Sequence, residues 1–362
     1  MKVAEKEFHI YANERPKVLL LGNGLYRAFG GMSWNGLLDE IKDQEEFPLP
    51  AERYYMPMPL KAAMLTNNTL ASKMREIVKE GGATSNYHNT RKTNWNDFTK
   101  TSYEMREYIN QLVRNDFDYV LTTNYSYEIE AALLNENSLS PNQIAKLMNF
   151  HEVDHPQLQF LINTFNYVEK CSVWHIHGEA RKPDSMIIGS YYYGKILKRC
   201  IERLDGGGQS TDGDYSGQVR SSGKTSEFKR NIKQKKPQKI GSWVDAFVLG
   251  DVYILGLGMD FSEADLWWLL EYKQNNSDFC GKTELLEAQK RSRQACLIDE
   301  KEDCEYYGKY VDGRQCRNLL MKTYHVDITD LGVTINSSED YKYFYTRVAD
   351  YFTNPYVVNR VK

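Results

Sequence analysis

Paired cysteines, long apolar runs and a strong excess of charge are all missing from this sequence of 362 residues. The six cysteines never form a Cys-x-x-Cys pair, which argues against a zinc ribbon and gives no support to a disulfide framework. No apolar run approaches the roughly 18 residues that a membrane helix needs, and the charged N-terminus lacks the apolar core of a secretion signal. The formal net charge of −3 gives no overall case for nucleic acid as a partner. We therefore expect a cytoplasmic protein with no membrane partner.

Short apolar runs that end in glycine or a polar residue predict the strands of a parallel sheet. Six runs fit this description: residues 17–24, 117–124, 172–177, 251–256, 294–299 and 324–329. Helical patterns separate or follow them at residues 105–113, 127–134, 263–272 and 341–352. Strands that alternate with helices predict an α/β fold with a doubly wound, Rossmann-like parallel sheet of about six strands.

Two segments interrupt this alternation, although we expect residues 1–362 to form a single domain. Residues 36–113 are expected to be a mostly helical insertion. Residues 205–239 are rich in Gly, Ser, Lys and Gln, and are expected to be a flexible insertion. Within it, residues 220–239 hold eight basic residues and one acid, Glu227. This stretch is either a solvated loop or a contact for an acidic partner or nucleic acid.

A Gly-x-Gly turn, Gly22-Asn23-Gly24, follows the first predicted strand. Such a turn lets backbone N–H groups approach a diphosphate closely, although many strands end in glycine for turn geometry alone. A dehydrogenase fingerprint would place its third glycine at position 27, where this chain has Arg27. The turn therefore favours nucleotide binding but argues against a dehydrogenase.

Polar residues gather at the ends of the second and third predicted strands, where Thr123 and Asn124, and then His175, His177 and Gly178, are found. The Asn124 amide could position a water or a ribose hydroxyl, or simply cap the helix that follows. Residues two apart on a strand share a face, so the two histidines could bind a metal, but no third ligand is evident nearby. We expect no metal and interpret His177 as a catalytic base, since an imidazole titrates near pH ~6.5. A hydrogen-bonded core histidine is the alternative, and it suits His175 better.

Two further strand ends carry candidate contacts for a nucleotide. Gly256 and Gly258 form a second glycine turn that could lie beneath an adenosine or diphosphate group, or be a plain β–α turn. Asp299 ends the fifth predicted strand and could hydrogen-bond a ribose hydroxyl, or be a simple turn residue. Because open α/β sheets bind ligands at the carboxyl ends of their strands, all these residues could line one crevice.

Taken in order along the chain, these motifs resemble the sirtuin-like family of bacteria. The matching segments are Gly22-Asn-Gly24, Ser33-Trp-Asn-Gly-Leu-Leu38, Thr122-Thr-Asn-Tyr125, His177-Gly178, and Gly256-Leu-Gly258 with Asp265-Leu-Trp-Trp268. The resemblance is to the antiphage defence branch rather than to the deacylases, since this chain lacks the four-cysteine zinc module of the deacylases. Two positions depart from the family pattern: Asn23 stands where alanine is usual, and Ser126 where aspartate is frequent.

The resemblance implies that the chain binds NAD⁺ as its substrate and hydrolyses it to nicotinamide and ADP-ribose, with Asn124 and His177 as the catalytic pair. The residues expected to contact the dinucleotide are Gly22, Asn23, Gly24, Thr123, Gly178, Gly256, Gly258 and Asp299. It further implies a homo-oligomer that depletes NAD⁺ during phage infection, triggered in some cases by a partner defence protein. The alternatives are NAD⁺-dependent deacylation or ADP-ribosylation, and a non-catalytic sensor of NAD⁺ or ADP-ribose.

Overall fold

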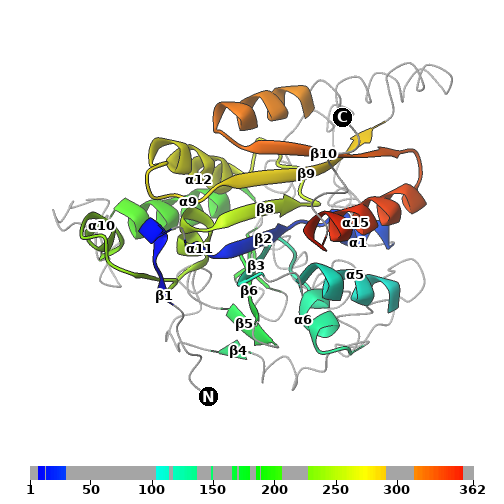
Figure 1. Cartoon of the computed structure of the whole chain (residues 1–362), viewed down its shortest axis with the longest axis horizontal. Coiled ribbons are helices and arrows are strands. Elements are labelled where there is room, and N and C mark those ends of the chain that lie inside the picture. Colours follow the sequence, from blue (N-terminus) through cyan, green and yellow to red (C-terminus); the bar gives the residue numbers. More distant parts are fainter. Residues whose placement is uncertain are drawn as a thin grey trace, which may run out of the picture.

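A central eight-stranded sheet organises the protein in the computed structural model, which describes residues 7–12, 14–29, 103–113, 117–136, 148–149, 165–168, 171–179, 185–187, 189–205, 227–290 and 314–353. Its strands are, in chain order, β2 (Lys17–Leu21), β3 (Tyr119–Thr122), β4 (Met148–Asn149), β5 (Phe165–Val168), β6 (Cys171–His175), β8 (Asp251–Leu255), β9 (Thr283–Lys290) and β10 (Asp327–Ile335). Figure 1 shows them side by side in the order β10-β9-β8-β2-β3-β6-β5-β4.

The six strands from β10 to β6 run parallel and confirm the predicted α/β fold with a doubly wound sheet. Numbered by their place in the chain, these parallel strands lie in the order 3-2-1-4-5-6, which is that of dinucleotide-binding sheets. The order reverses between β2 and β8, which pair from Lys17 with Asp251 to Leu21 with Leu255. Sheets of this kind bind their ligands in the crevice at such a reversal, beyond the carboxyl ends of the strands.

Helices cover both faces of the sheet, which explains why its inner strands are continuous apolar runs. Side chains alternate between two cores: Leu20 of β2 and Ile254 of β8 lie in one, and Leu19 and Leu21 of β2 lie in the other. The first core is closed by α9 (Ser190–Asp205), α10 (Glu227–Lys233), α11 (Trp243–Leu249) and α12 (Ala264–Asn275). The second is closed by α1 (Gly24–Ala28), α5 (Tyr103–Val113), α6 (Glu128–Leu133) and α15 (Ser338–Thr353). The helices predicted at 105–113, 127–134, 263–272 and 341–352 are therefore confirmed.

The fifth parallel strand lies earlier in the chain than predicted. It is β9, Thr283–Lys290, whereas the predicted run 294–299 lies outside the described residues. In β9 only the pair Leu285 and Leu286 is strongly apolar, and charged residues flank it. The strand therefore shows neither an apolar run nor a clean alternation. The antiparallel edge strands β5 and β4 were not predicted either.

The basic segment is partly regular. Residues 227–239 form helix α10 and strand β7 (Gln238–Lys239), and β7 pairs antiparallel with β1 (Glu7–Phe8). This part of the insertion that was expected to be flexible thus contains a helix and a strand, and Phe228 and Ile232 of α10 are buried in the first core. Residues 206–226, and residues 36–102 of the predicted helical insertion, lie outside the described residues. Among the described residues, no helix combines the length and the apolar character needed to cross a membrane.

Candidate functional site at the strand ends

Two glycine turns meet where the strand order reverses. The N–H of Gly22 donates to the Leu255 oxygen at 2.9 Å, and the N–H of Gly24 donates to the Gly256 oxygen at 2.7 Å. A Cβ on Gly22 would lie 2.6 Å from the Gly256 oxygen, and one on Gly24 would lie 2.7 Å from it. The turns thus require glycine because they pack against each other. The N–H groups that the sequence suggested for a diphosphate already have backbone partners.

A cavity of about 370 Å³ opens beside these turns, on the β8–β9–β10 side of the reversal. Gly24, Gly256 and Gly258 line it, together with the middle of β9 and side chains from α15. Its charged lining residues are Arg27, Arg314, Arg317 and Glu287. Three arginines against one glutamate give a formal charge of +2, so the cavity favours an anionic ligand.

Glu287 of β9 fixes two of these arginines, which come from the helix at residues 314–323. Arg314 and Arg317 contact its two carboxylate oxygens at 2.9 and 2.5 Å. Burial raises the pKa of Glu287, but hydrogen bonds and charges from the two arginines outweigh burial and lower that pKa overall. Arg317 also donates to the Gly258 oxygen at 3.0 Å. The second glycine turn is therefore tied directly to the cationic wall of the cavity.

Asn124 lies next to the first glycine turn, just beyond β3. Its side-chain Nδ2 donates to the Gly22 oxygen at 3.3 Å, and its backbone N–H donates to Thr122 Oγ1 at 3.1 Å. His175 also holds the backbone of Asn124, since Nδ1 of the His175 ring donates to the backbone oxygen of Asn124 at 2.7 Å. The amide is buried, with 6% of the residue exposed, and it stands beside the reversal.

His175 is a charged structural residue. Its Nε2 lies 2.9 Å from Oε1 of Glu130 on α6, and Glu130 is completely buried. Burial by itself lowers the pKa of His175, but the charge and hydrogen bond of Glu130 raise it to about 9. Both ring nitrogens therefore donate at neutral pH. This agrees with the interpretation of His175 as a hydrogen-bonded core histidine.

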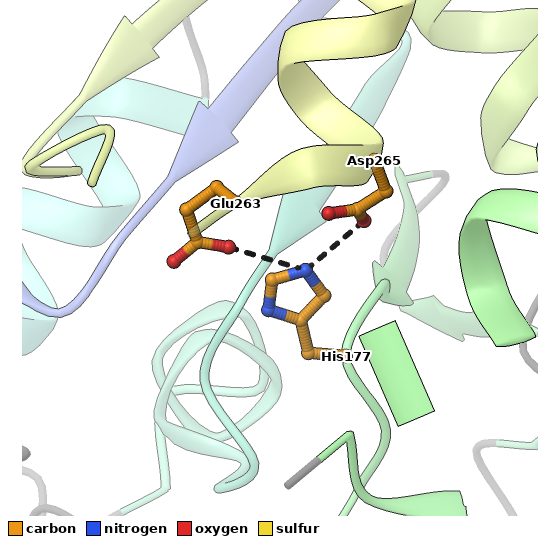
Figure 2. Close-up of side chains that lie close together, drawn as sticks. All are labelled: His177, Glu263 and Asp265. Carbon is orange, nitrogen blue, oxygen red and sulfur yellow. Dashed lines mark hydrogen bonds and ion pairs between the residues drawn. The ribbon is translucent and has the colours of Figure 1, made fainter. Parts of the chain in front are cut away.

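His177 faces different partners from His175, because β6 ends at His175 and the chain turns there. The prediction that the two histidines share one strand face is therefore wrong. Nε2 of His177 lies 3.2 Å from Oδ2 of Asp265 and 3.6 Å from Oε2 of Glu263 (Figure 2). Tyr193 of α9 packs edge-on against the imidazole, and its hydroxyl donates to Glu263 Oε2 at 3.3 Å.

The carboxylates of this cluster make the imidazole of His177 a stronger base. Burial lowers the pKa of His177, but the charges of Asp265 and Glu263 and the Asp265 hydrogen bond raise it overall. Burial raises the pKa of Glu263 to about 7, against the opposing effect of His177. One ligand atom from each of the three residues lies within 4.8 Å of the other two, so they could surround a small cation. The hydrogen bonds of the cluster account for the arrangement without one.

Asp265 entered the sequence analysis only as part of the resembling segment Asp265–Trp268, and Glu263 was not singled out. Asp265 lies in the first turn of α12, directly after the second glycine turn, and it is completely buried. A helix start favours a carboxylate in any case, so this position alone gave no hint of a histidine partner. The sequence feature that could have identified them is the pair of acidic residues, Glu263 and Asp265, that follows the turn at Gly256–Gly258.

The carboxyl ends of β3 and β6 bring Asn124 and His177 to the same edge of the sheet. Thr122 pairs with His175 in the register, and each candidate lies two residues beyond that pair. No hydrogen bond joins Asn124 to His177 in the part of the chain that the structure describes. The two side chains are therefore near the same strand ends but are held by different partners.

Thr123 and Gly178, two of the predicted contacts, also lie at this edge. Thr123 follows β3 and donates its N–H to the Leu21 oxygen, while Gly178 has φ +95° and lies against Ser185. Ser126, the departure from the family pattern, is buried and hydrogen-bonded to Glu128, whose pKa burial raises to about 8. An aspartate there would bring a second carboxylate to a buried carboxyl group. Asp299 lies outside the described residues.

No known family model matches the chain, and neither does any curated protein sequence.

Proposed function

We propose that the protein is an NAD⁺ hydrolase that releases nicotinamide and ADP-ribose. The observation that carries the proposal is the cationic cavity at the reversal of a dinucleotide-type sheet, with Asn124 and His177 at the neighbouring strand ends. The diphosphate of NAD⁺ carries two negative charges, and the described lining of the cavity carries a formal charge of +2. A binding role for Arg314 and Arg317 suits this ligand, because guanidinium groups bind phosphates through paired hydrogen bonds.

The cluster around His177 does not line the cavity, but its charges suit the chemistry of the reaction. Nicotinamide leaves as a neutral base, and positive charge develops on the ribose that remains. Asp265 and Glu263 bring negative charge close to His177, and they would favour that cation through space. Asn124 would orient the ribose or the attacking water, and His177 would accept the proton of that water.

Purified protein incubated with NAD⁺ tests the proposal directly, with nicotinamide and ADP-ribose separated by chromatography. Release of both products in equal amounts supports hydrolysis. A transferase would instead yield nicotinamide and an ADP-ribosylated acceptor, and a deacylase would yield nicotinamide, a deacylated lysine and acyl-ADP-ribose. A sensor would bind NAD⁺ without turnover. Because the resemblance implies an enzyme that waits for a trigger in antiphage defence, the assay should be repeated with candidate partner proteins before the absence of turnover is taken as final.

The Arg27→Ala variant should bind NAD⁺ about tenfold more weakly and keep the melting temperature of the parent protein. Arg27 lines the cavity, is exposed, and forms no ion pair with any residue that the structure describes. Its loss removes a charged hydrogen bond of about 1.5–3 kcal/mol from the ligand, and each 1.4 kcal/mol corresponds to about tenfold in affinity. Calorimetric titration with ADP-ribose measures the change without interference from turnover.

Arg230→Ala on α10 is the matched control, because it removes the same charge from an exposed position outside the cavity. Equal losses of affinity in the two variants would show only a general effect of net charge. The assignment of the cavity to the diphosphate would then be wrong.

A further inference from the structure

Two carboxylates lie within 4 Å of Nε2 of His177, but only Asp265 is at hydrogen-bonding distance. The separations are 3.2 Å to Asp265 Oδ2 and 3.6 Å to Glu263 Oε2. A carboxylate can only accept, so the hydrogen of this bond belongs to Nε2 of the imidazole. In the neutral ring, a proton on Nε2 leaves the lone pair on Nδ1.

The other ring nitrogen, Nδ1, is not held by either carboxylate. Figure 2 shows that both dashed lines to the carboxylates start from the same ring nitrogen, Nε2, and that none starts from Nδ1. In the described part of the chain, Nδ1 forms no hydrogen bond. Asp265 is fully buried in the first turn of α12, where the helix dipole favours a negative charge.

We propose that Asp265 is the positioning residue of this site: it holds the proton of His177 on Nε2, so that Nδ1 is the nitrogen that accepts the proton of the attacking water. The inference depends on the proposed function, since it assigns the ring nitrogen and its orienting partner for that reaction. Water attacks the ribose C1′ while the C1′–N bond to nicotinamide breaks. The electron pair of that bond neutralises the nicotinamide ring, and the proton of the water passes to Nδ1 and then to solvent.

The groups that face the imidazole decide how the site responds to pH. They are Asp265 and Glu263 at the start of α12, and Tyr193 of α9, whose pKa is raised well above its usual value by burial and by Glu263. Tyr193 therefore stays neutral, and the two carboxylates are the groups that raise the pKa of His177. A base with a raised pKa is free only at higher pH, so nicotinamide release should rise with pH on the acid side of its profile.

The Asp265→Asn variant tests the assignment. An asparagine amide can donate to Nε2, which moves the ring proton to Nδ1 and removes the base. We expect kcat to fall about 10²–10⁴-fold, which is the usual contribution of general-base catalysis, with little change in KM. The loss of the carboxylate charge should also move the acid limb of the remaining activity to lower pH, and Asp265→Glu should recover part of kcat.

Asp245→Asn is the matched control, because Asp245 is also fully buried in the first turn of a helix, α11, but its partner there is Arg203. This variant should lose stability and keep both kcat per folded molecule and the pH profile. ¹⁵N NMR of the imidazoles gives an independent readout, with the His177 signal identified by its loss in His177→Gln. The parent protein should show the Nε2–H tautomer, and Asp265→Asn should show a lower His177 pKa.

The outcomes separate the two proposals. A protein that binds but never hydrolyses NAD⁺ overturns the proposed function and any catalytic use of the pair. A protein that releases nicotinamide, but whose Asp265→Asn variant keeps the parent kcat, pH profile and tautomer, overturns only the role of Asp265.

Discussion

The His177→Gln variant should release nicotinamide about 10²–10⁴-fold more slowly than the parent protein, the range expected when a positioned proton acceptor is lost. The Asn124→Ala variant should be slower by about 10²-fold, the loss expected when a reactant is misplaced by about 1 Å. For Asn124, the cause is the loss of the amide that lies against the Gly22 oxygen at the reversal of the sheet. For His177, the cause is the loss of the imidazole at the end of β6. Initial rates of nicotinamide release from saturating NAD⁺ measure both effects.

Glutamine is preferred to alanine at position 177 because its amide can still donate to Asp265. Alanine there would leave a buried carboxylate without its partner, and a loss of folding would hide the loss of chemistry. His9→Ala is the control for a histidine that is exposed and remote from the strand ends. If both site variants keep the parent rate while binding NAD⁺ normally, these two residues are not the catalytic pair.

The strands that could be predicted from the sequence are those buried on both faces. Val18–Leu21 of β2 are all buried apolar residues, as are Val252, Ile254 and Leu255 of β8, and apolar runs of this kind predicted the six-strand α/β fold. β9 could not be found in this way, because its charged residues are matched by distant parts of the chain. Glu284 bonds Thr329 and Tyr351, and Glu287 binds Arg314 and Arg317. A pattern read from neighbouring residues cannot predict partners that are distant in the sequence.

The site was predictable at its strand ends but not in its partners. The sequence located Asn124 and His177, because polar residues directly after buried strands are visible in a one-dimensional pattern. It could not find the hydrogen bond from His177 to Asp265, which spans 88 positions. The glycines were also located correctly, yet the packing of one turn on the other explains Gly22 and Gly24 without any ligand. The strand ends could be predicted because they are local features of the sequence. The partners could not, because they are contacts between segments that are adjacent in the fold but distant in the sequence.

The Glu130→Ala variant should lose about 3–5 kcal/mol of unfolding free energy, the range expected when one partner of a buried ion pair is removed. Glu130 is fully buried and lies 2.9 Å from Nε2 of His175, which is protonated at neutral pH because its pKa is raised to about 9. Without Glu130, the imidazolium must lose its proton or remain buried without its carboxylate partner. Urea unfolding at pH 7 measures the change. A loss below about 1 kcal/mol, typical of exposed pairs, would contradict a charged His175.

The same pair predicts how stability depends on pH. The folded-state pKa of His175 is raised from 6.5 to about 9, so its stabilisation is fully present below pH 6.5 and is lost as the pH rises through 9. At about 1.4 kcal/mol per pKa unit, that loss is about 3 kcal/mol. Glu130→Gln keeps a hydrogen-bond acceptor but not the charge, so its unfolding free energy should fall less over this range. Burial raises the pKa of Glu128 to about 8 and adds a pH dependence of the same sign. Because the charge of Glu130 also contributes to the raised pKa of Glu128, both curves are measured in a Glu128→Gln background. There the difference between the curves with and without the Glu130→Gln substitution reports His175, and two parallel curves would show that His175 is not charged in the folded protein.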